Sequence, residues 1–319
     1  MSGSNDHIGG EARRYGKATI GEAAARLHAG GLVAVPTETV YGLAADSTNA
    51  SAVAEIYRTK GRPDFNPLIV HVPDMVAARR LGRLNDLAAC FAEALWPGPL
   101  TLVVPKSEDC PVAAAVTAGL DTIALRCPAH PVMRELLEAS GLFLAAPSAN
   151  RSGGISPTTA DHVARSLGEE APMILDGGPC TQGIESTIVA IADDHYRILR
   201  PGPVTEARLT EIVGKPPSGE TSGKIEAPGQ MSSHYAPSKP LRLNALSAMT
   251  DEYLIGFGPV SGDRNLSPDA DLAEAASYLF AALHYADGSG KPRIAVAPIP
   301  GEGIGIALND RLIRAATPA

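Results

Sequence analysis

The feature that most constrains the fold is the alternation of short apolar segments with helix-periodic segments over the first two thirds of the chain. Short apolar runs bounded by turn residues indicate strands, and apolar residues spaced three and four apart indicate helices. The expected strands are Leu32–Pro36, Leu68–Val72, Leu100–Val104, Thr122–Arg126, Leu142–Ala146 and Met173–Leu175. The expected helices are 20–29, 50–60, 74–81, 86–95, 131–140 and 158–167.

The order of these elements predicts an α/β domain with a twisted, mixed sheet. Residues 186–199, interrupted by Asp193 and Asp194, are expected to form a β-hairpin. Because a hairpin pairs its strands antiparallel, we do not expect a purely parallel, doubly wound sheet. The predicted domain covers residues 15–213, and the polar residues 1–14 are expected to be a disordered lead-in.

Residues 214–240 differ from their surroundings, since they are rich in Pro, Gly and Ser and almost free of aliphatic periodicity. This composition is typical of a linker, and linkers of this length inside a chain are usually functional or disordered. A plain spacer does not need His234 and Tyr235, so we expect the segment to act as a lid. Residues 241–319 have a strand–helix–strand–helix order, which predicts a small Rossmann-like α/β domain.

Composition narrows the possible functions. The 27 basic and 35 acidic residues give a net charge of −8, which does not suit non-specific binding of a nucleic-acid backbone. No apolar run is long enough to span a bilayer, and the N-terminus lacks an apolar signal core. The four cysteines form no C-x-x-C pair, so we expect neither a zinc site nor a disulfide framework. A reducing, cytoplasmic compartment fits this cysteine usage best.

Two clusters of polar side chains follow predicted elements directly. Pro36–Leu43 places hydroxyls, a carboxylate and a phenol after the first strand, where open α/β sheets bind ligands. The alternative is a loop whose threonines bond the local backbone. Lys60 and Arg62 flank a glycine at the end of a helix and suit one anion, the alternative being a helix C-terminal cap.

Further polar groups lie at other strand ends. Arg126 ends a strand, which either needs a partner or emerges into water, and His71 taken alone is typical of a buried, hydrogen-bonded histidine. Ser148, Asn150 and Ser156 lie among glycines and suit phosphate contacts, although Ser156 also suits helix capping. Cations and hydroxyls with few general bases favour a nucleotide-handling enzyme.

Several motifs in order resemble those of the YrdC/Sua5 family of threonylcarbamoyl-AMP synthases. They are Pro36–Leu43, Lys60–Pro63, Trp96–Thr101, Pro147–Gly153 and Glu185–Ile188. The likeness covers about residues 15–213, and His234–Pro237 and Gly305–Arg311 resemble the two-domain Sua5 form. It implies a YrdC-like catalytic domain followed by a Sua5 C-terminal domain, here shorter than we expect for the family.

The resemblance implies an enzyme that converts L-threonine, bicarbonate or CO2, and ATP into threonylcarbamoyl-AMP and pyrophosphate. The product would serve the N6-threonylcarbamoyladenosine modification at position 37 of tRNA, through a separate tRNA threonylcarbamoyltransferase complex. Such an enzyme is a cytoplasmic nucleotidyltransferase. Mg²⁺ is expected to arrive with ATP through its phosphates, without an assigned protein ligand. Neither a membrane nor direct tRNA binding is expected.

The resemblance also implies two groups of site residues. The expected ATP-binding residues, of which the first two would be catalytic, are Lys60, Arg62, Asn66, Thr122, Ser148, Asn150, Ser156, Arg200 and Tyr235. The expected L-threonine-binding residues are Thr39, His71, Arg126, Ala146 through its backbone, and Ser186.

Two other functions remain alternatives. One is a non-catalytic module that binds tRNA or double-stranded RNA, as the basic concave face of single-domain relatives suggests. The net charge of −8 weighs against it. The other is a carbamoyl-handling domain of the hydrogenase-maturation type, which is disfavoured because its acylphosphatase and zinc-finger segments are absent.

Overall fold

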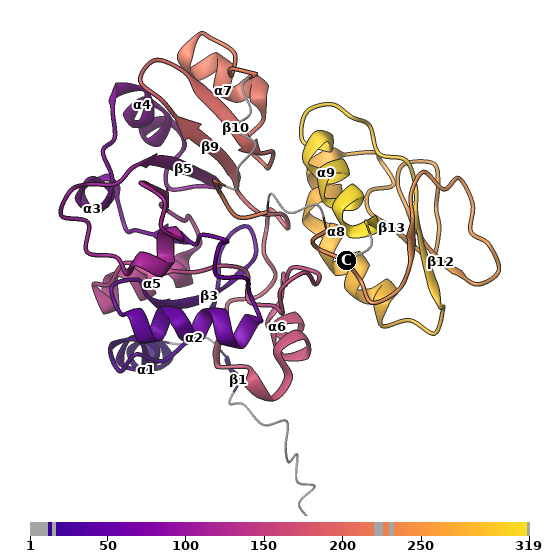
Figure 1. Cartoon of the computed structure of the whole chain (residues 1–319). Coiled ribbons are helices and arrows are strands. Elements are labelled where there is room, and N and C mark those ends of the chain that lie inside the picture. Colours follow the sequence, from indigo (N-terminus) through magenta and orange to yellow (C-terminus); the bar gives the residue numbers. More distant parts are fainter. Residues whose placement is uncertain (1–11, 15–16, 220–225, 230–232, 318–319) are drawn as a thin grey trace, which may run out of the picture.

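The computed structural model describes residues 12–14, 17–219, 226–229 and 233–317. One ten-stranded sheet, ordered β1-β8-β2-β3-β7-β4-β6-β5-β9-β10, is the scaffold of the larger part of the molecule (Figure 1). Its strands are β1 (Ala12–Arg14), β2 (Val33–Pro36), β3 (Tyr41–Asp46), β4 (Ile69–His71), β5 (Leu100–Pro105), β6 (Thr122–Arg126), β7 (Leu144–Ala145), β8 (Met173–Asp176), β9 (Thr187–Ile191) and β10 (Tyr196–Arg200). Parallel and antiparallel pairs occur together, so the predicted mixed sheet is confirmed.

Helices cover both faces of this sheet. They are α1 (Lys17–His28), α2 (Ala50–Lys60), α3 (Met75–Leu81), α4 (Asp86–Leu95), α5 (Pro131–Ser140), α6 (Ala160–Leu167) and α7 (Glu206–Val213), with single 3₁₀ turns at Ala114–Thr117 and Gly168–Glu170. Along β2, Val33 and Val35 join the core formed with α1 and α5, whereas Ala34 joins the core formed with α2. This alternation is the period of two that a strand between two helix layers requires.

Several predicted elements have the expected bounds, namely α2, α4, α5 and β6, and the predicted hairpin is present as β9 and β10. The start of α2 is explained by Asn49, whose side chain accepts hydrogen bonds from the backbone N–H groups of Ser51 and Ala52. Gly61 ends the helix in the left-handed conformation, with φ 59°. The chain therefore turns sharply between Lys60 and Arg62.

The alternative of a loop over Pro36–Leu43 holds only for residues 37–40, because β3 begins at Tyr41. β3 pairs antiparallel with β2, with Val33 opposite Ala44. Only residues 37–40 form the turn, in which Thr37 Oγ1 donates a hydrogen bond to the carbonyl oxygen of Val40 at 2.7 Å. The hydroxyls of this segment made it resemble a loop, but its small apolar residues pair as a strand.

The expected disordered lead-in at residues 1–14 is corrected at its end, because Ala12–Arg14 form β1 and pair parallel with β8. The free edge of β8 offers unpaired backbone groups that this strand satisfies. Residues 1–11 and 15–16 lie outside the described residues. The described chain also contains α7, which the sequence did not predict.

The C-terminal unit has its own parallel sheet with the order β11-β14-β12-β13. Its elements are β11 (Leu241–Arg242), β12 (Glu252–Gly256), β13 (Arg264–Asn265), α8 (Leu272–Asp287), β14 (Arg293–Val296) and α9 (Gly305–Ala316). Both helices lie on the side that faces the ten-stranded sheet (Figure 1). Its core includes Val40, Ile155 and Ile184 from the larger part of the molecule, so the two units share a hydrophobic core.

The described parts of the segment 214–240 pack against both units. Ala227 is buried in a cluster with Ile69 and Ile188 of the large sheet. The backbone N–H of Ala236 donates to the carbonyl oxygen of Gly153 at 2.8 Å, while Tyr235 belongs to the core of the C-terminal unit. The stretches around Ala227 and Tyr235 are thus buried between the two units. Residues 220–225 and 230–232 of the predicted lid lie outside the described residues.

Candidate active site

A cavity of about 50 Å³ lies where the segment 214–240 covers the ends of several strands of the large sheet. Its volume suffices for a few water molecules. The lining residues are Thr37, Thr39, Val40, Gly42, Arg62, Ile69, His71, Arg126, Ala146, Pro147, Ser148, Glu185, Ser186, Arg200, Pro228, Gly229, His234 and Tyr235. Three arginines and several hydroxyls in one enclosed space suit a ligand with several anionic oxygens.

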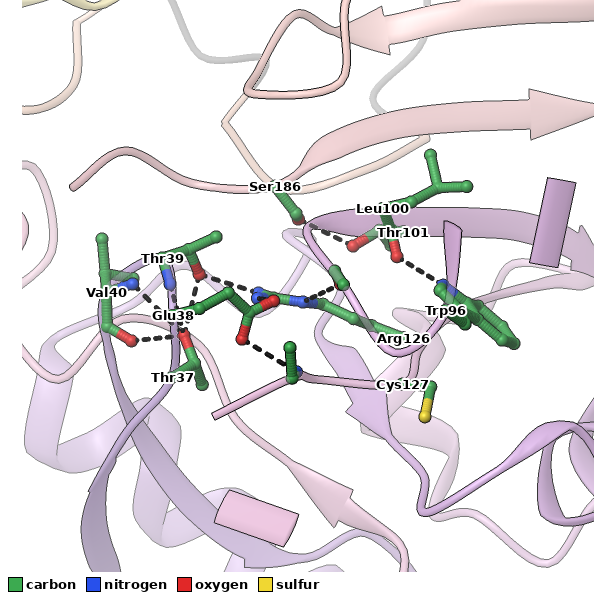
Figure 2. Close-up of polar contacts among 12 residues, drawn as sticks. Thr37, Glu38, Thr39, Val40, Trp96, Leu100, Thr101, Arg126, Cys127 and Ser186 are labelled. Atoms are coloured by element: carbon green, nitrogen blue, oxygen red, sulfur yellow. Dashed lines mark hydrogen bonds and ion pairs between the residues drawn. The ribbon is translucent and has the colours of Figure 1, made fainter. Parts of the chain in front are cut away.

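One end of the cavity is built on two parallel strands. β4 and β6 run side by side with His71 opposite Arg126, so both side chains reach the same edge of the sheet. Arg126 is only 4% exposed, so the alternative that its strand emerges into water is wrong. Its guanidinium donates to Thr39 Oγ1 at 2.9 Å, to Glu38 Oε1 at 2.5 Å and to the carbonyl oxygen of Gly98 at 3.3 Å (Figure 2).

The interpretation of His71 as a hydrogen-bonded core histidine does not hold for its Nδ1, which has no partner among the described residues. Burial, with a smaller contribution from the positive charge of Arg126, lowers the pKa of His71 to about 3. The ring is therefore neutral at pH 7. A neutral imidazole with an unpaired nitrogen at the cavity wall is available to a ligand.

Ser186 forms the next part of the wall, and the hydroxyl of Thr101 contacts it from the neighbouring strand. Ser186, just before β9, has its Oγ 2.7 Å from Oγ1 of Thr101 on β5 (Figure 2). Arg200, at the end of β10, donates to the carbonyl oxygen of Ser186 at 2.9 Å and to its Oγ at 3.2 Å. Burial lowers the pKa of the Arg200 guanidinium from its ordinary value. The hairpin β9–β10 thus delivers a hydroxyl and a cation to one place.

The third arginine of the cavity comes from the turn after α2. Arg62 is 9% exposed and donates to the carbonyl oxygen of Asn66 at 3.1 Å and to its Oδ1 at 2.7 Å. Burial lowers the pKa of Arg62 to about 10, so the guanidinium remains charged at pH 7. Asn66 is itself buried and does not line the cavity. Asn66 orients the Arg62 guanidinium through these two hydrogen bonds.

Lys60 is placed differently from what we expected, because it does not line the cavity and its amine is bound by protein oxygens. Nζ donates to the carbonyl oxygens of Ser148 and Asn150, both at 2.6 Å, and lies 3.4 Å from Asn150 Oδ1. Burial, and the charge of Arg62, hold the pKa of Lys60 well below its usual value. Three oxygen acceptors nevertheless match the three N–H groups of an ammonium ion. Lys60 ties the end of α2 to the 148–150 turn.

Ser156 does not line the cavity, and its hydroxyl is bound by the carboxylate of Glu185. Its Oγ donates to Glu185 Oε1 at 2.5 Å, and Oε2 of the same carboxylate accepts from Arg311 Nε on α9 at 2.9 Å. Burial alone would raise the pKa of Glu185, but Arg311 and then Arg200 lower it, so the carboxylate is ionised. Glu185 lines the cavity and so brings the C-terminal unit into contact with its wall.

The described part of the segment 214–240 closes the cavity. A Cβ added to Gly229 would lie 2.9 Å from the Tyr235 hydroxyl and 3.0 Å from Arg200 Cδ, so the chain passes very close to both side chains. The Tyr235 hydroxyl and the Nδ1 of His234 are buried without a hydrogen-bond partner among the described residues. Unpaired buried polar atoms are costly unless something absent from the protein completes them.

The expected site residues therefore fall into two groups. Those that line the cavity are Thr39, Arg62, His71, Arg126, Ala146, Ser148, Ser186, Arg200 and Tyr235, and those outside it are Lys60, Asn66, Thr122, Asn150 and Ser156. Thr122 begins β6 and Arg126 ends it, so their backbones are about 13 Å apart. A role of Thr122 in ATP binding stays a prediction.

Sequence reasoning missed three buried charged residues around the cavity, Glu38, Glu185 and Arg311. Each belongs to a motif that was noticed, but a sequence alone does not indicate which carboxylate pairs with which arginine. Arg126 was the one signal for Glu38, because a charged residue at the end of a buried strand predicts a buried partner of opposite charge.

Other kinds of site find no support in the described part of the chain. No three or more His, Cys, Asp or Glu side chains gather there in a way that would hold a metal ion. The four cysteines are free. No helix in the described ranges has the length and apolar character needed to cross a membrane.

The mixed sheet, the arginine-lined cavity and the chain segment beside it define an α/β protein with a small cavity whose lining suits an anionic ligand. Two family models match the chain. The Sua5/YciO/YrdC model, described as "Telomere recombination", matches residues 25–202, and the model of the threonylcarbamoyl-AMP synthase C-terminal domain matches residues 204–317. The chain belongs to the Sua5/YrdC family of enzymes and has its two-domain form.

Relatives that match most of the chain carry one name. The threonylcarbamoyl-AMP synthase of Bacillus subtilis is 39% identical over 93% of this chain and 92% of its own length. That of Pyrococcus abyssi is 37% identical over 92% of each. The crystal structure of P. abyssi Sua5 complexed with L-threonine superimposes with a TM-score of 0.86 and 34% identity, covering 98% of both chains. E. coli YciO, at 20% identity and a TM-score of 0.53, shares the fold of the larger part.

Proposed function

We propose that the protein is an L-threonylcarbamoyladenylate synthase, which forms threonylcarbamoyl-AMP and pyrophosphate from L-threonine, bicarbonate or CO2, and ATP. The observation that carries the proposal is the cavity that gathers Arg62, Arg126 and Arg200 with serine and threonine hydroxyls. The names of the full-length relatives and the threonine complex of the P. abyssi protein support it. The enzyme is then a nucleotidyltransferase.

The end of the cavity around Arg126 suits L-threonine. A guanidinium has five N–H donors, and the protein uses three of them at Arg126, which leaves two for the α-carboxylate of the amino acid. Thr39, Ser186 and the unpaired Nδ1 of His71 offer hydrogen bonds to the amine and hydroxyl of threonine. The backbone at Ala146 lies on the same wall. A site that bonds the hydroxyl rejects analogues that lack it.

The end around Arg62 and Arg200 suits the phosphates of ATP. A carbamate oxygen formed on threonine attacks the α-phosphorus, and the bond to the β-phosphate oxygen breaks to release pyrophosphate. Two anions meet in this step, so the guanidinium groups stabilise the charge that develops. Ser148 lies on the cavity wall beside them. Asn66, Asn150 and Ser156 support the same region through Arg62, the 148–150 turn and Glu185.

Mg²⁺ is proposed to accompany ATP. Because the described residues contain no cluster of three metal-ligating side chains, the ion has to be held mainly by phosphate oxygens, which is its common mode of binding. When bound, it neutralises phosphate charge. Glu185 is the carboxylate on the described cavity wall that could contact its water ligands.

The segment 214–240 is proposed to act as a lid. A cavity of about 50 Å³ is too small for ATP, whereas binding pockets for drug-sized ligands are about 300–1,000 Å³. Pro228, Gly229, His234 and Tyr235 form part of the closed wall, so displacing them is the simplest way to admit the nucleotide. Tyr235 then closes over it. Closure excludes water from a carbamate that would otherwise decompose.

The product is proposed to leave as a diffusible adenylate for a tRNA threonylcarbamoyltransferase complex in the cytoplasm. The alternative of a non-catalytic RNA-binding module gains no support, because the arginines discussed above are buried around the cavity rather than spread over a surface. Filter binding of tRNA at two salt concentrations separates the two. Tight, strongly salt-dependent binding without threonine-dependent pyrophosphate release would favour the alternative.

The direct test is pyrophosphate release from ATP with and without L-threonine and bicarbonate. We expect release only when both are present. Arg62→Ala should lower the rate about 10²–10³-fold, as for the loss of one group that stabilises transition-state charge. Arg293→Ala is a matched control, because this arginine is exposed and lies in the C-terminal sheet. Equal rates for Arg62→Ala and wild type would contradict the proposed site.

A further inference from the structure

Glu38 is a buried carboxylate beside the cavity that the proposed reaction does not use directly. It is 6% exposed, and its Oε1 accepts a hydrogen bond from Arg126 Nη2 at 2.5 Å. Its Oε2 accepts from the backbone N–H of Ala129 at 3.0 Å (Figure 2). The backbone of Glu38 is held as well, because its carbonyl oxygen accepts from the N–H of Gln182 at 2.7 Å. Both carboxylate oxygens and the main chain are therefore fixed.

The carboxylate of Glu38 is ionised. Burial alone would raise the pKa of Glu38, but the adjacent Arg126 and the backbone N–H groups lower it below its ordinary value. Two buried opposite charges at 2.5 Å form a pair with a fixed geometry. A Glu38–Arg126 pair is therefore a rigid unit of the cavity wall rather than a solvent-screened contact.

The orientation of Arg126 follows from this pair. Its Nε is directed at Gly98, Nη1 at Thr39 and Nη2 at Glu38, which uses one donor on each nitrogen. One N–H on Nη1 and one on Nη2 have no partner among the described residues. These two donors lie on adjacent nitrogens of the planar group, the arrangement that binds a carboxylate through both of its oxygens.

We propose that Glu38 is a positioning residue for substrate recognition, which holds the Arg126 guanidinium so that two of its N–H groups meet the α-carboxylate of the amino-acid substrate. This rests on the proposed function. Thr39 and Gly98 offer only neutral acceptors, and the contact to Gly98 is long at 3.3 Å, so Glu38 supplies the one charge-assisted hydrogen bond that fixes the plane of the guanidinium. Through Ala129, Glu38 also ties this group to the chain that follows β6.

The test compares L-threonine with L-threoninamide, in which an uncharged amide replaces the carboxylate. Pyrophosphate release gives kcat/KM for each amino compound, and the ratio of the two values measures how strongly the carboxylate is recognised. We expect E38Q to lower this ratio about 10- to 100-fold, the range for one charge-assisted hydrogen bond. The effect should appear mainly in KM for L-threonine, while KM for ATP stays within about twofold.

Two further variants keep the result decisive. E38D retains the charge but shortens the side chain by one methylene, so we expect a folded enzyme with an intermediate ratio. E252Q is the matched control, since Glu252 is also buried and paired with an arginine, Arg242, but lies in the C-terminal sheet. Its ratio should equal that of wild type.

The possible outcomes are distinct. If E38Q and E38D lowered kcat/KM for both compounds by the same factor, Glu38 would be only structural and the proposal would be wrong, with the proposed function intact. If the wild-type protein released no pyrophosphate with L-threonine, the proposed function itself would fail, and the role of Glu38 with it.

Discussion

Arg311 Nε lies 2.9 Å from Glu185 Oε2, and this buried ion pair joins helix α9 of the C-terminal unit to the cavity wall. The Arg311 side chain is fully buried, and its guanidinium also donates to the carbonyl oxygen of Pro201 at 3.0 Å and lies 5.3 Å from the centre of the Tyr235 ring. The Arg311 side chain of the C-terminal unit thus contacts Pro201 just after the β9–β10 hairpin, Glu185 on the cavity wall and Tyr235 of the segment 214–240. The C-terminal unit therefore supports the cavity wall through Glu185, although none of its own residues lines the cavity.

Arg311→Met should therefore destabilise the protein and lower its activity. The substitution leaves the Glu185 carboxylate buried without its partner, which typically costs about 3–5 kcal/mol. Urea unfolding and pyrophosphate release measure the two effects. Arg293→Met is the control, because Arg293 pairs with Asp251 on the surface at 3.4 Å and should contribute less than about 1 kcal/mol. Equal losses for both variants would contradict a special role for the buried pair.

Gly183→Ala should weaken the packing between the two units. Gly183 has φ 69°, and a Cβ there would overlap the backbone of Ala276 and Ser277 on α8. We expect a loss of about 1–3 kcal/mol from this overpacking, beyond the cost of the backbone conformation, together with lower activity. Gly141→Ala is the matched control, since Gly141 has φ 64° but open space around it. Thermal unfolding of both variants separates the cost of the backbone conformation, which both share, from the cost of the overlap with α8, which only Gly183→Ala has. Similar melting temperatures for the two variants would argue against the overlap.

The sequence predicted most elements because their signals are local. The apolar periodicity of α2, the Asn49 cap and the Gly61 C-cap are all readable within a dozen residues. β3 was missed because pairing with β2 depends on a four-residue turn, whereas its own residues carry no strong strand propensity. The two-residue strands β11 and β13 exist only through their neighbours in the sheet and have no signal of their own.

The candidate site was predictable in its residue types but not in its pairing. Strand ends carrying Arg126, Ser186 and Arg200 pointed to an anionic ligand, and the structure brings these side chains to one cavity. The direction of Lys60 was not predictable, because the carbonyl oxygens it binds belong to a turn about 90 residues away. Long-range polar contacts of this kind leave no periodic trace in a sequence.

Stability should fall as the pH drops from neutral toward 4. Burial lowers the pKa of His71, His162 and His234 to about 3 and that of His284 to about 4. Below the unfolded value of about 6.5, the unfolded chain takes up protons that the folded protein does not, so each histidine contributes up to about 1.4 kcal/mol per pH unit. The lost stability accumulates between about pH 6.5 and the folded pKa values.

His162→Phe tests this pH dependence. The His162 ring is stacked on that of His284, with 3.9 Å between the ring centres, and a phenyl ring can keep this stacking but cannot bind a proton. Urea unfolding at several pH values between 7.5 and 4.5 should give a slope smaller by about 1.4 kcal/mol per pH unit than that of wild type. An unchanged slope would mean that His162 takes up its proton in the folded protein.

Lys60→Met should act mainly on stability. Methionine fills the same space but leaves the acceptors on Ser148 and Asn150 without their donor, at a cost of about 1–3 kcal/mol for each buried group left unpaired. We expect a lower unfolding midpoint in urea and a higher KM for ATP, since the 148–150 turn loses its anchor. A variant as stable as wild type but inactive would instead mean that Lys60 turns toward the phosphates during the reaction.

Tyr235→Phe should lower activity without lowering stability. The Tyr235 hydroxyl is buried without a partner among the described residues, so its removal should leave stability unchanged or raise it by about 1–3 kcal/mol. If the hydroxyl meets the bound nucleotide, the same change lowers kcat/KM by about 10-fold, the value of one hydrogen bond. Thermal unfolding and pyrophosphate release on one preparation measure both. A parallel loss of both quantities would show that the hydroxyl serves the fold rather than the ligand.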